Sequence, residues 1–262
     1  MQVKSLEKFL KKLVPHRYYS KYVASDIMSP YQSVLAGPFK GMKYISASTG
    51  SKLYPKILGI YEKELEEVVT KLMERDYQKM INVGAAEGYF AVGFALKSGD
   101  IKVLAYEMEE KGRQNIKKLA ALNNVLPKLE IKGECTVEEL NKCVTADNLI
   151  VMDVEGAEDF LLDPATCPAL IRTDILLEVH ENKVPGVEQR IRKRFSDTHD
   201  IEEIDAVART ENDLDITFDL TADQKIFNAF TLGKFRKSVI KRLVDEYRPS
   251  QIKWFVMTRQ ST

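Results

Sequence analysis

The chain after Asp76 alternates short apolar runs with amphipathic segments. The apolar runs lie at residues 80–83, 103–106, 129–131, 149–153 and 175–179. The helical segments that separate and follow them lie at residues 89–97, 113–122, 158–162 and 187–195. Such alternation predicts βαβ units, in which right-handed crossovers join parallel strands. The runs "NLIVMDV" and "DILLEV" are almost continuously apolar, which is typical of parallel strands buried on both faces. We therefore expect a doubly wound, mostly parallel α/β sheet.

The last part of the chain has a different rhythm. Its pattern predicts a strand at residues 201–204, an amphipathic helix at 235–247 and a final strand at 252–257. The final strand follows Pro249 and can run antiparallel beside its neighbours. With the five earlier runs, this gives a sheet of seven strands.

The first 76 residues are less regular and predict a helical and irregular extension. Residues 15–38 suggest a loop that wraps the domain, and residues 41–46 suggest a short strand. A strong helix should follow Gly59. Apolar residues at helical spacing also predict a short helix at the start of the chain, namely Val3, Leu6, Leu10 and Leu13.

We accordingly divide the chain into an extension, residues 1–76, and one α/β domain, residues 77–262. Tyr54, Tyr61 and Glu62 lie just before the domain. They either pack against and cap the supporting helix or form a lid over a cleft, and the pattern allows both.

The composition limits which kinds of partner and which cellular compartment we expect. Lys plus Arg and Asp plus Glu both number 39 in 262 residues, so no global charge favours bulk nucleic acid or an anionic membrane. No apolar run approaches the roughly 20 residues that span a bilayer. The three cysteines form no CxxC pair, which indicates a reducing compartment. We expect a cytoplasmic protein with a small-molecule partner and no membrane partner.

The segment "MINVGAAEGYFAVGFAL", residues 80–96, is the most informative. Gly84 and Gly88 allow a tight turn between a strand and a helix, and ligands of open α/β sheets bind at this end of the strands. A dinucleotide fingerprint requires a second glycine where this chain has Ala86, and the neighbouring Glu87 would repel a pyrophosphate. A carboxylate there could instead face the ammonium and sulfonium of S-adenosylmethionine. The predicted donor contacts are Asn82, Gly84, Ala85, Glu87, Gly88 and Tyr89.

The next two strand ends support an adenosine ligand. Glu107 ends the second strand, where a carboxylate can accept hydrogen bonds from both ribose hydroxyls, as it does in nicotinamide-binding domains. Met108 could pack on the adenine face. Glu134 and Cys135 follow the third strand, and Glu134 could accept a hydrogen bond from the exocyclic amine.

Acidic residues also follow the fourth strand, in "IVMDVEGAEDFLL", and the fifth strand ends in "ILLEVHEN". Asp153 and Glu155 should therefore lie near Glu178 and His180 at one edge of the sheet. These carboxylates could orient the donor, remove a proton or hold a divalent cation. Glu158 is either part of this group or a first-turn carboxylate favoured by the helix dipole.

The four segments "INVGAAEGYFAVGFA", "LAYEMEEKGRQNIKKLAALNNV", "MDVEGAEDFLL" and "ILLEVHE" resemble the FkbM-type methyltransferases. The resemblance covers about residues 79–181. It implies a class I S-adenosylmethionine-dependent enzyme, mostly linked to O-methylation of natural products and sugars, in which Gly84, Gly88, Glu107 and Asp153 line the donor site. The chain departs from the family at Asn82, where Asp is usual, and at Glu87.

The sequence thus predicts a methyltransferase that acts on an oxygen of a small or sugar-like acceptor, with S-adenosylmethionine as cofactor. The expected base is His180 oriented by Glu178, and Asp153 is the competing base. We predict no metal, although Asp153, Glu155 and Glu178 offer oxygen ligands that suit magnesium. Two other classes stay open: an NAD-linked oxidoreductase on a similar sheet, and a non-catalytic scaffold that binds an adenosine ligand.

Overall fold

The computed structural model describes residues 16–216, 219–246 and 252–260. The helix expected at the start of the chain lies outside these residues, as does Tyr247 at the end of the helix expected over 235–247. Among the described helices, none combines the length and hydrophobicity that crossing a membrane would require.

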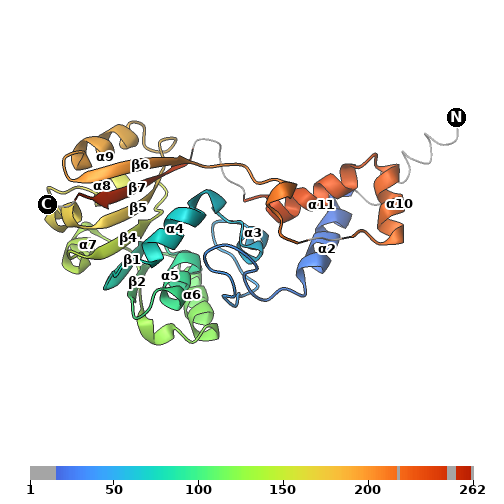
Figure 1. Ribbon diagram of the computed structural model, residues 1–262, viewed down its shortest axis with the longest axis horizontal. Helices are drawn as coiled ribbons and strands as arrows, with labels where there is room; N and C mark the ends of the chain where they lie inside the picture. The colour runs from blue at the N-terminus through green and yellow to red at the C-terminus, as the bar shows by residue number, and fades with distance from the viewer. Residues whose placement is uncertain (1–15, 217–218, 247–251, 261–262) are drawn as a thin grey trace.

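A seven-stranded sheet forms the centre of the protein (Figure 1). Its strands run in the order β3-β2-β1-β4-β5-β7-β6; the first five are parallel, and β7 is antiparallel to both of its neighbours. The expected doubly wound sheet with an antiparallel closing strand is confirmed. The bounds are β1 (Lys79–Val83), β2 (Lys102–Tyr106), β3 (Leu129–Lys132), β4 (Asn148–Met152), β5 (Asp174–Val179), β6 (His199–Asp205) and β7 (Lys253–Arg259).

Helices cover both faces of the sheet, and each face has its own hydrophobic core. One core contains α4 (Glu66–Met73), α5 (Tyr89–Lys97) and α6 (Glu110–Leu122). The other contains α7 (Val137–Cys143), α8 (Glu158–Leu161) and α9 (Val187–Phe195). Strands β4 and β5 are buried along their whole length, which explains why their sequences are almost continuously apolar. Single-turn helices complete the connections: η1 (Lys63–Leu65), η2 (Leu126–Lys128), η3 (Pro168–Arg172) and η4 (Glu211–Asp213).

A helical lobe extends from the sheet and brings α2, near the start of the chain, together with α10 and α11, which come late in it (Figure 1). It consists of α2 (His16–Met28), α10 (Ala222–Phe230) and α11 (Lys234–Val244), with α3 (Leu53–Leu58) between the lobe and the sheet. Tyr19 stacks on Phe235 with ring centroids 4.9 Å apart and meets the edge of Phe227 at 5.2 Å. The division of the chain at residue 76 remains a prediction, because the segment before it packs on α11.

Two expectations for the first part of the chain are wrong. The wrapping loop expected over 15–38 is largely helix α2, because Val23 and Ala24 pack into the core and Arg242 bonds Ser20 from the far end of the chain. The strand expected over 41–46 is a single bridge between Ser33 and Lys43. There the amide of Lys43 donates to the Asn123 side chain, 2.8 Å away, instead of to a strand partner.

The register of the parallel strands aligns their carboxyl ends. Val83 lies beside Tyr106 of β2 and Met152 of β4. The amide of Asp153 donates to the Val83 carbonyl at 3.0 Å, so the loop after β4 begins directly against the glycine loop. This edge of the sheet is where ligands of such folds bind.

Candidate active site

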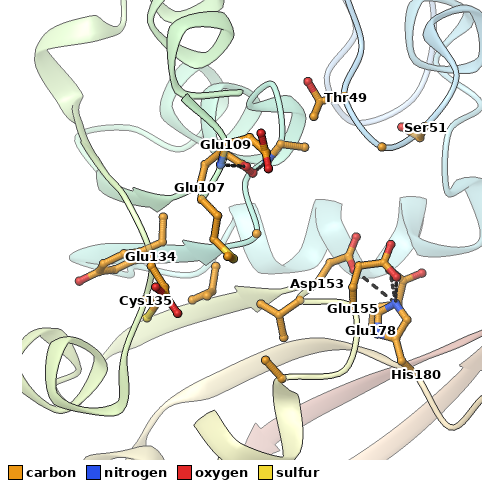
Figure 2. A pocket seen from close by; sticks show the side chains of 18 of the residues that line it. Thr49, Ser51, Glu107, Glu109, Glu134, Cys135, Asp153, Glu155, Glu178 and His180 are labelled. Carbon is orange, nitrogen blue, oxygen red and sulfur yellow. Dashed lines mark hydrogen bonds and ion pairs between the residues drawn. The ribbon is translucent and has the colours of Figure 1, made fainter. Parts of the chain in front are cut away.

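A cavity of about 410 Å³ opens at the carboxyl ends of the parallel strands (Figure 2). Eight of the predicted site residues line it: Gly84, Glu107, Met108, Glu134, Cys135, Asp153, Glu178 and His180. Five do not line it: Asn82, Ala85, Glu87, Gly88 and Tyr89. The site residues after strands β2 to β5 are therefore brought together, whereas most of the glycine-loop residues lie behind the cavity wall.

The glycine loop is closed by its own hydrogen bonds. Gly84 has a φ of 79°, and a Cβ built on it would lie 1.7 Å from the Asp153 carbonyl oxygen, so only glycine fits. The amides of Gly84 and Ala85 both donate to the carbonyl of Tyr106, at 3.0 and 2.9 Å, and the amide of Gly88 donates to Ala85. These three amides are consequently not directed at a ligand.

Glu107 holds the turn after β2 against the glycine loop. Its carboxylate accepts from the amide of Ala86 at 2.7 Å and from the amide of Glu109 at 2.8 Å (Figure 2). The residue is 8% exposed and lines the cavity. A Cβ on Gly112 would lie 2.6 Å from Glu107 Cγ, so α6 can approach only through a glycine. Two amide donors thus fix a carboxylate at the cavity wall, with lone pairs left to accept from a ligand.

The residues after β3 form the opposite wall from the loop after β4, and Figure 2 shows Glu134 and Cys135 together there. Burial raises the pKa of the Cys135 thiol to about 12, so this cysteine is an unreactive part of the wall. Met108 is 69% exposed at the rim. Met108 and Cys135 can pack against a flat apolar group, and the Glu134 carboxylate beside them can accept a hydrogen bond.

Glu87 is fully buried and does not line the cavity. Its carboxylate pairs with the Lys56 ammonium and accepts from Tyr44 at 2.8 Å, Ser48 at 3.1 Å and the Thr49 amide at 2.9 Å. Burial alone would raise the pKa of this carboxyl, but Lys56 and the other donors hold it below its usual value. The structure therefore does not support the expectation that Glu87 faces a cationic ligand.

The two remaining residues behind the wall have structural contacts. Asn82 lies within β1 and its side-chain amide donates to the Val151 carbonyl at 3.1 Å. Tyr89 packs edge-on against Phe39 and Tyr61, with ring centroids 5.1 and 5.2 Å apart, respectively. Neither contact requires a ligand.

His180 stands at the end of β5 among carboxylates (Figure 2). Its ring is 1% exposed; Nδ1 lies 3.2 Å from Glu158, and Nε2 lies 3.5 Å from Asp153, 3.5 Å from Glu155 and 3.7 Å from Glu178. Burial alone would lower the pKa of His180, but the surrounding carboxylates raise it above its usual value. The imidazole accordingly retains its proton more strongly than a free histidine does.

Glu158 occupies the orienting position that the sequence assigned to Glu178. It is fully buried, and it accepts from the backbone amides of His180 at 2.7 Å and Gly156 at 2.8 Å as well as from the His180 ring. Burial alone would raise the pKa of Glu158, but these donors lower it. Its position in the first turn of α8 was the only sequence signal, and that signal also fitted a helix-dipole role.

Several residues of the cavity come from outside the predicted donor and acceptor sites, and Tyr61 alone among them was predicted to act, as a lid or as a packing residue. Their shared property is that they reach the cavity from outside the parallel strands: Thr49, Ser51, Lys56 and Tyr61 before the domain, and Glu246 and Ile252 near its end. Glu246 accepts from Arg209 at 2.9 Å, and Arg209 also pairs with Glu64. No local pattern marks these residues, because their placement depends on contacts across the whole chain.

Comparisons with known proteins support the fold. No protein-family model matches the sequence, and no curated protein matches it. Among solved structures, a proposed rRNA methylase from Clostridium thermocellum is 7% identical with a TM-score of 0.50, over 76% of this chain and 96% of that one. A SAM-dependent O-methyltransferase from Thermotoga maritima is 13% identical with a TM-score of 0.46, over 77% and 66%. The O-methyltransferase TomG from Streptomyces achromogenes is 12% identical with a TM-score of 0.45, over 78% and 90%. At such identities the likeness shows the fold alone, and the fold is the Rossmann-like sheet of class I methyltransferases.

Proposed function

We propose that this chain is an S-adenosylmethionine-dependent methyltransferase that transfers the methyl group to an oxygen of a small-molecule acceptor. The observation that carries the proposal is Glu107. Amides of the glycine loop and of the turn after β2 hold its carboxylate at the cavity wall, where it can accept from the two hydroxyls of a ribose.

The charge of the cavity favours the methyl donor over a dinucleotide. Seven acidic side chains line it, whereas the basic lining residues are Lys56 and His180. A pyrophosphate also needs free amides at the glycine loop, and those of Gly84, Ala85 and Ala86 are already bonded within the protein. A sulfonium ion needs neither, and an acidic wall attracts it. This argument replaces the one that Glu87 supplied from sequence.

The reaction would be an in-line displacement. The bond between sulfur and the methyl carbon breaks, its electron pair returns to sulfur, and the acceptor oxygen forms the new bond to carbon as its proton leaves. Asp153 is our first choice for the group that takes this proton. The carboxylates around His180 raise the pKa of its ring, so the imidazole gives up its own proton less readily and is less available to accept another.

Two further features support an oxygen acceptor of modest size. The resemblance to FkbM-type methyltransferases runs through "DVEGAE" and "LLEVH", and these segments supply Asp153, Glu155, Glu178 and His180 at the cavity. The cavity volume of about 410 Å³ also limits the size of the acceptor, because the donor occupies part of the same space. We infer a small or sugar-like acceptor that binds beside these residues.

Calorimetric titration tests the donor assignment. We expect S-adenosylmethionine to bind and NAD to give no heat, and we expect Glu107→Gln to weaken the donor about ten-fold or more, since a hydrogen bond to a charged group contributes about 1.5–3 kcal/mol. Glu109→Gln is the matched control, because its side chain lines the same wall without holding the loop amides, and its affinity should stay within about two-fold. Binding of NAD instead would indicate an oxidoreductase. Binding of neither ligand would refute both enzymatic assignments.

A further inference from the structure

Three carboxylate oxygens surround one imidazole nitrogen at the end of the cavity opposite Glu107 (Figure 2). Asp153 Oδ1 and Glu155 Oε2 each lie 3.5 Å from His180 Nε2, and Glu178 Oε2 lies 3.7 Å from it. The single ligand atoms that Asp153, Glu155 and His180 offer all lie within 4.8 Å of one another. They come from the loop after β4 and from the end of β5.

These separations are too long for strong hydrogen bonds. An N–H···O bond spans roughly 2.7–3.2 Å, so the imidazole does not satisfy the oxygens it faces. Two ligand atoms that share one ion at about 2.1–2.3 Å lie about 3.0–3.7 Å apart, and the distances from His180 Nε2 to Asp153 Oδ1 and to Glu155 Oε2 fall in this range. Asp153 Oδ1 is moreover a buried atom that accepts no hydrogen bond within the described part of the chain. An unsatisfied buried acceptor requires an explanation, and an ion supplies one.

The other side of the ring is arranged as in histidines that bind metals. Nδ1 lies 3.2 Å from Glu158, whose carboxylate is held by the amides of His180 and Gly156. A carboxylate there accepts a hydrogen bond from Nδ1–H, fixes the ring plane and turns the Nε2 lone pair toward the other ligands. The ring is 1% exposed, so its orientation is set by the protein interior and not by solvent.

We propose that Asp153 Oδ1, Glu155 Oε2 and His180 Nε2 bind a divalent cation of the Mn²⁺ or Zn²⁺ class, with Glu178 beside it. One imidazole and two carboxylates suit a first-row transition ion better than Ca²⁺, which takes oxygen ligands alone. The cation replaces the proton on Nε2 and offsets the repulsion among the carboxylates. Lys183 pairs with Glu155 from the exposed side and competes with the cation for that carboxylate.

The cation also defines the acceptor more closely, and this step rests on the proposed function. A Lewis acid beside Asp153 would bind a hydroxyl oxygen of the acceptor and lower its pKa, so that Asp153 or Glu178 could take the proton. The acceptor class is then a hydroxyl compound whose oxygen can reach the cation from the cavity.

Titration of chelator-treated, dialysed protein with MnCl₂, followed by calorimetry and by the loss of the free Mn²⁺ resonance signal, tests the site. We expect one ion per chain, displaced by ZnCl₂. Glu155→Gln should weaken Mn²⁺ at least ten-fold, and this exposed side chain can be replaced without unfolding the protein. Asp153→Asn should weaken it further. Glu134→Gln, an acidic residue of the opposite wall, should leave Mn²⁺ affinity within about two-fold of the natural protein.

Several results would overturn the proposal. They are the absence of binding at millimolar Mn²⁺ and Zn²⁺, wild-type affinity in both Glu155→Gln and Asp153→Asn, or an equal loss in Glu134→Gln. Titration of S-adenosylmethionine into the metal-free protein distinguishes failure of the cation site from failure of the proposed function. If the donor binds and the cation does not, the cation site is refuted and the proposed function stands. If the cation binds and the donor does not, the methyltransferase assignment is refuted and the cation site stands.

Discussion

The two ends of the cavity hold their carboxylates in opposite ways. At the end of β2 and the glycine loop, Glu107 accepts from two amides at the cavity wall, and Glu87 behind that wall accepts from Lys56, Tyr44, Ser48 and Thr49. At the ends of β4 and β5, three carboxylates face one imidazole at 3.5–3.7 Å. The carboxylates at the first end accept hydrogen bonds from groups of the protein, whereas those at the second end lie together around one imidazole.

This difference distinguishes the carboxylates that hold the backbone of the site in place from those that are available to bind a ligand. A buried carboxylate with several donors fixes the backbone around it, because leaving it without donors would cost several kcal/mol. Glu87 therefore positions Lys56 and the segment before α3, and Glu107 positions the glycine loop. Carboxylates that face one another across an imidazole repel each other, and a cation between them would offset that repulsion. The donor end is preorganised, and the acceptor end is completed by what binds there.

The largest effect should come from breaking the ion pair that closes the donor end. Lys56 is 2% exposed and Glu87 is not exposed at all, so Lys56→Met leaves a buried charge without its partner. We expect the free energy of unfolding to fall by about 3–5 kcal/mol, measured by urea denaturation. Removing both charges in Lys56→Met with Glu87→Gln should recover most of this loss.

Lys71→Met is the matched control for that experiment, because Lys71 forms its i,i+4 pair with Glu67 on the surface. Its unfolding should be unchanged within error. If Lys56→Met also left the free energy of unfolding unchanged, the ion pair with Lys56 would not hold Glu87 in place. The proposed difference between the two ends of the cavity would then be wrong.

A smaller effect should appear as a dependence of stability on pH. The pKa of Glu87 is lowered in the folded protein, so its contribution is present above its ordinary value of 4.5 and is lost as pH falls through the folded pKa. The stability difference between the natural protein and Glu87→Gln should therefore be widest near pH 7 and narrow below pH 4.5. Urea denaturation of both proteins at pH 7, 5 and 4 measures it. A difference that stayed constant or widened toward acid would mean that Glu87 is protonated in the folded protein.

The central sheet could be predicted from the sequence because its information is local. Continuous apolar runs mark strands buried on both faces, and α5 and α9 begin and end at the residues their periodicity predicts. The errors fall where structure depends on distant partners. Helix α2 is stabilised by α11, and the segment around Lys43 bonds Asn123 instead of forming a strand. No window of the sequence contains both members of such a pair.

The site divides in the same way. Strand-end residues such as Glu107, Asp153 and His180 could be placed because parallel strands end at one edge of the sheet. The orientation of the Glu87 side chain could not be predicted, because it depends on Lys56 and Tyr44, which lie 31 and 43 residues before it in the sequence. Glu158 lies on the Nδ1 side of the His180 ring because the turn into α8 brings it there, and the sequence alone did not separate its position from that of Glu178.

The smallest effect should come from Lys183, the cation that already lies at the open end. Lys183 pairs with Glu155 across the surface, and both side chains are largely exposed, so Lys183→Ala should change the free energy of unfolding by no more than about 1 kcal/mol. The same change frees Glu155, and we expect Mn²⁺ affinity to rise about two- to five-fold in calorimetry, the equivalent of one exposed ion pair. Lys142→Ala, which breaks an exposed pair with Glu139, should leave that affinity unchanged. A weaker Mn²⁺ affinity in Lys183→Ala would mean that the ammonium supports the carboxylates instead of competing for them.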